Sequence, residues 1–318
     1  MWDFDPVLLA ESGICGLIIQ GADETDDTLI VDLSQGDLPL SLTFHGGAGG
    51  YDTLVITGVT VGSYTPGQVF GDGTIQAGAT FISFTGLEPV FIDGASVSGA
   101  GPMGLDTTTL PSTLTFITPL SADAITIDSP AAGQNRISGT SGGVPFESIT
   151  FTNIQTVLID TGTNDEADAD GDTITIAGDL VATGLKNLAI TTGSGDDTLV
   201  VQTAHFTLPA PGGAFVFDGG TDLDTVRGPN AAIVWDLSGS GSGHLGGVSG
   251  LAFSNVESLV GSGNQDTYVF ANAASFGGTI DGGSGQNALD YSAYTTPVTV
   301  NLGAGTATAR AASATSTT

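Results

Sequence analysis

One short pattern recurs along the sequence: Asp or Asn, a small residue, an apolar residue, any residue and a second apolar residue. The apolar residues follow the first residue by two and four positions, so both side chains point to one face of a β-strand. The closest copies start about 25 residues apart, a period typical of solenoids. The copies are Asp27–Val31, Asp52–Ile56, Asp123–Ile127, Asp172–Ile176, Asp197–Val201, Asp224–Val226, Asp266–Phe270 and Asn287–Tyr291.

A second alternating segment precedes most of these copies, as in Val157–Asp160 and Phe215–Phe217. Each unit is therefore a strand, a Gly/Asp turn and a second strand. We predict an all-β fold, a parallel β-helix or related β-solenoid with coils of about 24–25 residues. The wider gaps between copies are close to multiples of this period, and we interpret Gly71–Gly73 and Asp93–Gly94 as degenerate turns within them.

The pattern divides the chain into two runs of coils, residues 1–94 and 116–303. Residues 95–115 are rich in turn-forming residues and lack the pattern, which predicts a linker or lateral loop. Residues 304–318 are small and polar, and we predict a disordered tail. The acidic start of the chain is unlike a signal peptide, and no apolar run is long enough for a membrane helix. We therefore expect no membrane insertion, and we expect any export signal to lie outside this chain.

The charge of the chain limits its partners. It holds 34 acidic and four basic residues, a formal net charge of −30, which argues against a nucleic acid partner. If Asp turns of adjacent coils stack at the strand spacing of about 4.8 Å, neighbouring carboxylates repel by about 3–4 kcal/mol at an effective dielectric constant of 20. A bridging cation would remove this repulsion, and calcium suits oxygen-rich sites. Alternatively, each Asp accepts hydrogen bonds from the amides of its own turn.

Two local features each leave two interpretations open. Residues 164–172 form the densest acidic cluster, and their alternating acids followed by Gly are similar to the first half of an EF-hand loop, although no downstream bidentate Glu follows. This cluster is either a metal site or a solvated acidic loop. Phe151–Ile154 and Phe253–Val256 share the pattern Phe-x-Asn-apolar. Their Asn side chains either stack as a hydrogen-bonded ladder or occupy turns.

Several of the Gly/Asp turns resemble the repeat-in-toxin nonapeptide, G-G-x-G-x-D-x-apolar-x, of haemolysin-type calcium-binding proteins. The clearest are Thr192–Val200, Gly219–Arg227 and Gly282–Asp290, and Gly47–Leu54 and Gly261–Tyr268 are variants. The segment from Trp235 to Leu302 also resembles repeats of very large bacterial surface and adhesin-like proteins. One departure is that the nonapeptides stand alone, one per coil, rather than in uninterrupted tandem.

The resemblance implies calcium bound between stacked coils by turn carbonyls and Asp carboxylates. It implies an extracellular or cell-surface bacterial protein with a structural or adhesive role, with cell-surface glycans or other cells as partners, and no enzymatic activity. The candidate calcium ligands are Asp52, Asp168, Asp170, Asp172, Asp196, Asp197, Asp222, Asp224 and Asp266.

Two other functions are the alternatives. A β-helix that binds or cleaves polysaccharide would use Asp222, Asp224 and Arg227, but an anionic substrate would meet a protein of charge −30. An ice-binding face would use the Thr residues that follow the repeat Asp, although β-propensity explains them more simply. The histidines have dissimilar surroundings in the sequence and show no paired spacing, so we interpret them as loop or turn residues. They are His45, His205 and His244.

Overall fold

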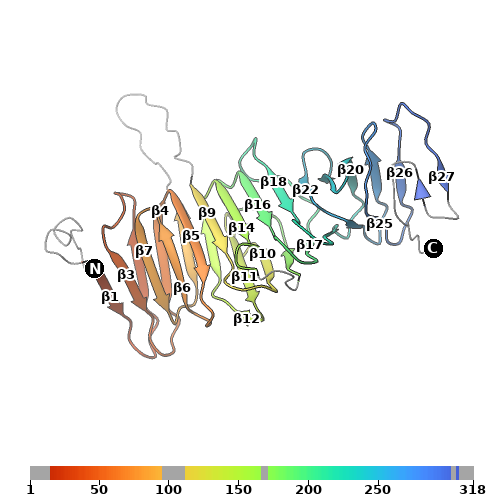
Figure 1. Ribbon diagram of the computed structural model, residues 1–318. Helices are drawn as coiled ribbons and strands as arrows, with labels where there is room; N and C mark the ends of the chain where they lie inside the picture. The colour runs from red at the N-terminus through yellow and green to blue at the C-terminus, as the bar shows by residue number, and fades with distance from the viewer. Residues whose placement is uncertain (1–14, 95–111, 166–170, 302–305, 308–318) are drawn as a thin grey trace, which may run out of the picture.

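A computed structural model describes residues 15–94, 112–165, 171–301 and 306–307, and every element in them is a β-strand (Figure 1). The strands stack side by side along one long axis, from β1 near the N-terminal end to β26 near the C-terminal end (Figure 1). The predicted all-β class is therefore confirmed. Nearly all strands belong to two long sheets, called sheet A and sheet B below.

Sheet A has fourteen strands and sheet B has twelve. In spatial order, sheet A consists of β1 (Gly16–Gln20), β3 (Ser41–His45), β7 (Thr80–Thr85), β6 (Gly73–Ala77), β5 (Val61–Pro66), β9 (Thr113–Ile117), β14 (Thr156–Asp160), β16 (Asn187–Thr191), β18 (Phe215–Asp218), β22 (Leu251–Ser254), β21 (Ser242–Leu245), β20 (Val234–Gly239), β24 (Thr267–Phe270) and β26 (Ala288–Asp290). Sheet B consists of β2 (Thr28–Asp32), β4 (Thr53–Val59), β8 (Val90–Gly94), β13 (Ile149–Thr152), β11 (Asn135–Ser141), β10 (Ala124–Asp128), β15 (Thr173–Ile176), β17 (Thr198–Val201), β19 (Thr225–Arg227), β23 (Ser258–Val260) and β25 (Thr279–Asp281), with β12 (Val144–Pro145) beside β11. A separate pair joins β27 (Val300–Asn301) to β28 (Thr306–Ala307).

Between the antiparallel insertions described below, the chain alternates between the two sheets, and each strand pairs in parallel with the equivalent strand of the next repeat unit. From β14 to β19, for example, successive strands belong to A, B, A, B, A and B. The register keeps equivalent apolar residues in one row, and all members of this row are buried. The row in sheet B is Ile174, Leu199, Val226, Leu259 and Ile280. Alternation of apolar and polar residues thus places one face of each strand in the core.

The core is a continuous apolar column between the sheets, widened at two places by aromatic rings. Near the first sheet-A insertion, the ring of Tyr64 packs 5.6 Å from that of Phe116, between centroids. Near the C-terminal end, Trp235 stacks on Tyr268 at 5.6 Å. Burial of each such ring stabilises the fold by roughly 2–3 kcal/mol. Because the Tyr64 hydroxyl is also buried, it donates to the carbonyl of Glu147, at 2.6 Å.

Three antiparallel meanders interrupt the parallel order: β5–β6–β7, β10–β11–β13 and β20–β21–β22. In each meander, the first strand leaves room for two strands between itself and the preceding strand of the same sheet. The chain then turns back, and two antiparallel strands fill that space. The first and third meanders lie in sheet A and the second lies in sheet B. Each meander therefore adds two strands to one sheet without advancing the other.

A common turn leads out of every meander. Asn153 and Asn255 follow the returning strands β13 and β22 and have φ values of 54° and 53°. Gly86 has the equivalent position after β7, with φ 66°. Asn and Gly tolerate this left-handed conformation better than other residues. The side chain of each Asn donates to an Asp at the end of a neighbouring strand, so the Phe-x-Asn motif forms a turn and not a stacked Asn ladder.

The meanders also correct the predicted spacing. Ala124 pairs directly with Thr173, 49 positions later, and the second meander accounts for the extra length between them. Asp93–Gly94, interpreted above as a turn, ends strand β8, and Gly71–Gly73 belongs to the hairpin from β5 to β6.

Two predicted segments fall partly outside the described residues. Within 95–115, residues 95–111 are not described, whereas Thr113–Thr115 belong to β9. Within 304–318, only Thr306–Ala307 is described, as strand β28, and the rest of the predicted tail lies outside the described residues.

Candidate functional site

An acidic residue lies at the start of nearly every strand of sheet B. We call this row the acidic ladder. Its members, in spatial order, are Asp27, Asp52, Glu88, Glu147, Asp123, Asp172, Asp197, Asp224 and Glu257. Ser141, at the end of the antiparallel strand β11, stands beside Asp123. Each acid stands one or two residues before its strand. The buried apolar face of the strand fixes its register, so the acids of successive strands lie in one row.

Hydrogen bonds join each coil to the next along the acidic ladder. The backbone amide of Asp123 donates to Asp172 Oδ1 at 2.7 Å, that of Asp172 to Asp197 Oδ1 at 2.6 Å, and that of Asp197 to Asp224 Oδ1 at 2.9 Å. The amide of Asp224 donates to Glu257 Oε2 at 3.0 Å. One oxygen of each accepting carboxyl therefore has a structural partner from the preceding coil, not from its own turn.

The second carboxyl oxygen is different. Oδ2 of Asp172, Asp197 and Asp224, and both carboxyl oxygens of Asp123, are buried and make no hydrogen bond. These four residues are at most 2% exposed. An ionised carboxylate buried without partners is costly, so each of these oxygens favours a proton or a cation.

Burial also shifts how these groups titrate. It raises the pKa of Asp123, Asp172 and Asp197 to about 6 and that of Asp224 to about 7, against an ordinary value of 3.8. Burial likewise raises the pKa of Glu147 to about 7, and the carboxylate of Glu88 adds to this shift. The ladder therefore carries less negative charge near neutral pH than its composition suggests.

The predicted calcium ligands that the structure describes fall into three groups. Asp52, Asp172, Asp197 and Asp224 belong to the acidic ladder, and Asp52 accepts the amide of Asp27 at 2.8 Å. Asp266 lies at the start of β24 in sheet A, away from the ladder, where it accepts the amides of Ile233 and Ser262. Asp168 and Asp170 lie outside the described residues.

Asp196 and Asp222 form the third group, on the turns themselves. Asp196 Oδ1 accepts the amide of Leu223 at 3.0 Å, and Asp222 Oδ2 accepts the amide of Gly195 at 3.4 Å. These carboxylates therefore join two stacked turns. Across the described ranges, no three Asp, Glu, His or Cys side chains already converge as a metal site.

Close stacking of the turns requires glycine. Gly220 has φ 93°, and a Cβ there would lie 2.0 Å from the carbonyl oxygen of Gly193 in the neighbouring turn. The amide of Thr221 donates to that same carbonyl at 2.9 Å. The glycines of the nonapeptide-like turns thus allow backbone contact between coils.

The sequence pattern did not identify the Glu members of the ladder, and it placed Asp165 only within the acidic cluster at 164–172. Glu88 and Glu257 precede short apolar stretches much as the repeat Asp does, but the repeat pattern begins with Asp or Asn. Asp165 lies in the turn between β14 and β15, and both of its carboxyl oxygens are buried without hydrogen bonds. Its burial shows only in three dimensions.

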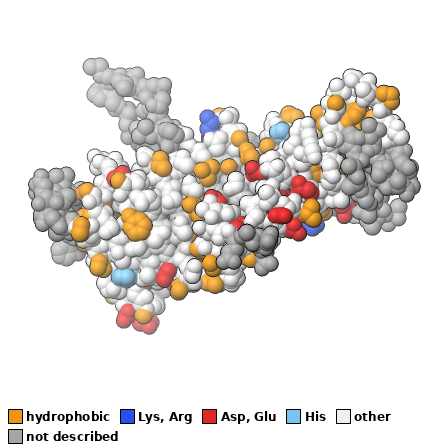
Figure 2. Space-filling view, in the orientation of Figure 1, with side chains coloured by type: hydrophobic (Ala, Val, Ile, Leu, Met, Phe, Trp, Pro, Cys, Tyr) orange, Lys and Arg blue, Asp and Glu red, His pale blue; other side chains and the backbone are white. Residues whose placement is uncertain are grey.

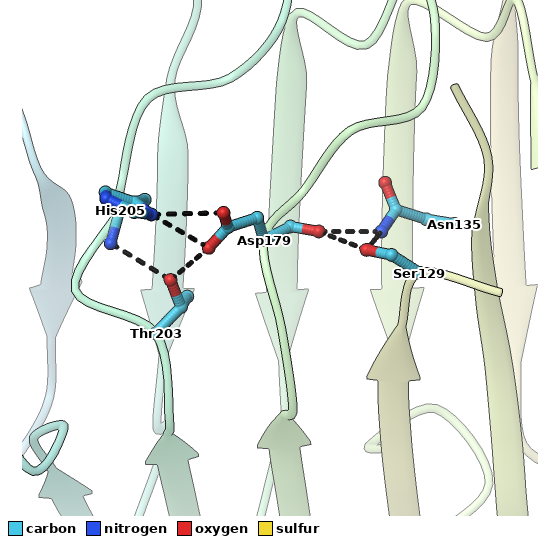
Figure 3. Close-up of polar contacts among 5 residues, drawn as sticks. All are labelled: Ser129, Asn135, Asp179, Thr203 and His205. Carbon is cyan, nitrogen blue, oxygen red and sulfur yellow. Dashed lines mark hydrogen bonds and ion pairs between the residues drawn. The ribbon is translucent and has the colours of Figure 1, made fainter. Parts of the chain in front are cut away.

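The opposite edge of the stack carries a polar cluster around Asp179 (Figure 3). The Asp179 carboxylate accepts the Thr203 hydroxyl and the Nδ1 of His205, the latter at 3.0 Å, and these contacts lower the pKa of Asp179. The buried amide of Asn135 donates to the carbonyl of Asp179 at 3.2 Å, and the hydroxyl of Ser129 donates to the same carbonyl. Both the hydroxyl and the imidazole donate to one carboxylate, so the imidazole is not placed as a base for the hydroxyl.

The residues of the two alternative functions are not gathered into one site. Arg227 is exposed on the outer face of β19, whereas Asp224 is buried at the start of that strand. Thr173, Thr198 and Thr225 stack in register in sheet B, but Thr267 belongs to sheet A. The row beside them contains Thr175, Val200 and Arg227 in place of uniform Thr.

The surface charge is unevenly distributed. Figure 2 shows a group of acidic side chains around β17 and β22, whereas the face over β3, β7 and β5 carries few charged side chains. No helix in the described ranges is long and apolar enough to cross a membrane. Comparisons with protein-family models, curated proteins and solved structures give no match to this chain. The likeness to repeat-in-toxin repeats therefore stays a prediction from the motifs.

Proposed function

We propose that the chain is a non-enzymatic, calcium-stabilised structural or adhesive segment of a large bacterial surface protein. In this proposal the two sheets are the opposite faces of a β-solenoid, which forms an extended spacer or contact surface outside the cell. The observation that carries the calcium proposal is the acidic ladder, in which buried carboxyl oxygens in successive coils make no hydrogen bond.

The structural role follows from the way the coils are joined. Each coil contacts its neighbours through two sheet ladders, an apolar column and the amide-to-carboxylate bonds of the acidic ladder. Stability of such an assembly is approximately a sum of coil and interface contributions, so a long rigid rod forms by simple repetition. The ladder makes that rigidity depend on what neutralises the carboxylates.

Calcium fits this requirement in chemical type. It binds carboxylate and carbonyl oxygens with flexible geometry, and Asp172, Asp197 and Asp224 each offer one buried oxygen without a hydrogen bond at the turn before their strand. Because no three acidic side chains converge in the described residues, calcium binding would require turn carbonyls or a side-chain movement. Calcium outside the cell would then stabilise the exported chain after secretion, since a ligand that binds only the folded state stabilises it.

Thermal unfolding followed by circular dichroism tests this proposal. We expect millimolar calcium at pH 7.4 to raise the midpoint by about 10 °C relative to EDTA, which corresponds to about 4 kcal/mol for a chain of this size. Magnesium at the same concentration is the control for general screening by a divalent cation. Identical midpoints in EDTA and calcium would contradict calcium stabilisation and leave a metal-free structural segment.

A further inference from the structure

Sheet A is longer than sheet B at the C-terminal end of the molecule. The two sheets are equal up to β14 and β15, because the first meander adds two strands to sheet A and the second adds two to sheet B. The third meander again lengthens sheet A, and no meander follows it in the described part of sheet B. With β26, sheet A has fourteen strands, against eleven in the continuous order of sheet B, which leaves out β12.

Two further strands make up part of this difference. After β26 the chain follows the connection from β24 to β25, where the Tyr294 hydroxyl donates to the carbonyl of Ala274 and the amide of Thr295 donates to Asn272 Oδ1 at 3.0 Å. It then forms β27, which lies farther along the axis than β26 (Figure 1), and β28, which pairs with β27 antiparallel. The earlier meanders begin with such a pair. Their order requires one more strand, between β25 and β28, where the described residues provide none.

The last strand of each complete meander, called the returning strand below, has one pattern. It is parallel to the strand behind it and antiparallel to the middle strand of the meander. Its sequence is apolar-x-Phe-x, followed by Asn or Gly with positive φ, and the apolar residue and the Phe are at most 3% exposed. The three copies are Ile82–Gly86, Ile149–Asn153 and Leu251–Asn255.

The strand behind each returning strand matches its last residue. Asn153 donates to Asp93 Oδ1 at 2.7 Å, and Asn255 donates to Asp218 Oδ1 at 2.6 Å. Gly takes the place of Asn after β7, where the strand behind, β3, ends in His45. An Asp at the end of the strand behind is thus accompanied by an Asn after the returning strand.

A glycine follows each of these Asp residues, because the returning strand passes close to it. A Cβ on Gly94 would lie 2.1 Å from the carbonyl oxygen of Asn153, and one on Gly219 would lie 2.4 Å from that of Asn255. The amide of Gly219 also donates to the carbonyl of Ser254 in the returning strand, at 3.1 Å. Asp followed by Gly therefore marks the end of a strand that receives a returning strand.

Strand β25, at the edge of sheet B, ends in the same way. Its last residue is Asp281, and Gly282 follows. One oxygen of the Asp281 carboxyl accepts an amide of its own turn, and the amide of Gly282 has no acceptor among the described residues. Ile280 has the position of Ile92 and Phe217, which pair with the Phe of the returning strands. The outer edge of β25 therefore matches a returning strand that ends in Asn.

We infer that sheet B accepts one added strand between β25 and β28, supplied by a second polypeptide with the pattern apolar-x-Phe-x-Asn. Residues 308–318 lie outside the described residues and contain neither Phe nor Asn, so they do not offer this pattern. Main-chain hydrogen bonds would hold the added strand, while its Phe, packed beside Ile280, and its Asn, which donates to Asp281, select its sequence. This contact goes beyond the proposed function and does not depend on calcium.

Binding of a synthetic peptide to the full chain tests the inference. The probe is a fluorescently labelled peptide with the sequence of residues 249–257, which contains the third returning strand. Fluorescence anisotropy in EDTA should show saturable binding. A Phe253→Ala peptide should bind at least about tenfold more weakly, because it loses a buried ring, and an Asn255→Ala peptide about fivefold more weakly, because it loses a hydrogen bond to a carboxylate.

Variants of the protein locate the bound peptide. Asp281→Ala should weaken binding of the parent peptide about fivefold, and it should bind the Asn255→Ala peptide equally well, because the two changes remove one and the same hydrogen bond. The matched control is Asp290→Ala. Asp290 ends β26 in sheet A and accepts the amide two residues later, as Asp281 does. This control should bind the parent peptide within about twofold of the wild type.

Two results would overturn the inference. Absence of saturable binding up to about 1 mM peptide would mean that the chain itself or a second copy closes this edge of sheet B. Saturable binding that neither Asp281→Ala nor the Asn255→Ala peptide weakens would place the peptide elsewhere on the molecule. Both results leave the calcium proposal untouched, because the unfolding experiment in EDTA and in calcium tests it separately.

Discussion

The same sequence motif takes two different positions in this molecule. Asp172, Asp197 and Asp224 precede strands of sheet B and form the middle of the acidic ladder, whereas Asp266 and Asn287 precede strands of sheet A. In both regions the amide of one repeat residue donates to the side chain of the next, as from Asp266 to Asn287 Oδ1 at 2.9 Å. The amide-to-side-chain bond therefore belongs to the motif, whichever sheet it joins.

The two regions differ in the second terminal atom of the side chain. In Asn287 this atom is Nδ2, which donates to the carbonyls of Gly283 and Ser284 at 3.3 and 3.4 Å. In Asp172, Asp197 and Asp224 it is an oxygen without a hydrogen bond. Asp266 in the C-terminal region also has a partner for its second oxygen, the amide of Ser262, so the difference comes from the turn and not from the choice of Asp or Asn alone. Asp172, Asp197 and Asp224 are the residues that leave a requirement for a proton or a cation.

The largest expected effect concerns the protons that the buried ladder carboxyls require when no cation is present. In EDTA, the free energy of unfolding of the wild type should fall as pH rises from 4 to 7. The folded-state pKa values of about 6 to 7 exceed the ordinary value of 3.8, so the folded state binds more protons in this range and loses stability as they dissociate. Each shift of two pKa units corresponds to about 3 kcal/mol at most.

The triple variant Asp172→Asn, Asp197→Asn and Asp224→Asn should flatten this pH dependence and exceed the wild type in stability at pH 7 by several kcal/mol. Urea unfolding at pH 4.5 and pH 7.5 measures both effects. A wild type that is more stable at pH 7.5 than at pH 4.5 in EDTA would show that the ladder carboxylates are ionised without cost.

The comparison is sharpened by separating the charge of one ladder residue from its hydrogen bond. Asp197→Asn keeps an acceptor for the amide of Asp172, whereas Asp197→Ala leaves that buried amide without a partner. We expect the Ala variant to be less stable than the Asn variant by about 2 kcal/mol, the cost of an unsatisfied buried donor plus a small cavity. Denaturant unfolding of the two variants side by side gives this difference, and equal stabilities would mean that the hydrogen bond does not hold the coils together.

The smallest expected effect is the reverse change in the C-terminal region. Asn287→Asp places a carboxylate oxygen against the carbonyls of Gly283 and Ser284. Asn287 is exposed, so solvent screens the repulsion, and we expect a loss of about 1 kcal/mol at pH 7. The loss should disappear near pH 4, when the new carboxyl is protonated. An unchanged midpoint at pH 7 would indicate that the two donor contacts of Asn287 contribute little.

Local sequence pattern predicted the strands but not their neighbours. The alternation in Thr173–Ile176 and Thr198–Val201 identifies buried faces, because a one-residue shift would expose every apolar side chain. The meanders could not be predicted in the same way, since Ala124 pairs with both Thr140 and Thr173 and nothing local selects such distant partners. Asp266 was predicted together with the residues of the acidic ladder for the same reason, because its motif fits a strand of either sheet.

The candidate site was predicted in part. Asp172, Asp197 and Asp224 were identified from the motif, because an acid before a strand marks the turn. Glu147 was not, since its burial depends on the second meander, which periodicity does not encode. Asp165 was predicted only as part of the acidic cluster at 164–172, and its burial could not be predicted from the sequence. The second carboxyl oxygen lacks a hydrogen-bond partner because of packing alone, and the calcium proposal rests on this missing partner.

The central claim is that the buried second oxygens of the ladder are covered by a proton or by calcium. A nuclear magnetic resonance titration of the side-chain carboxyl carbons of Asp, in EDTA and in calcium, tests it directly. We predict that Asp172, Asp197 and Asp224 titrate near pH 6 to 7 in EDTA, and that calcium lowers the apparent pKa of these carboxyls. Titration of all three near pH 4 in both solutions would contradict the account.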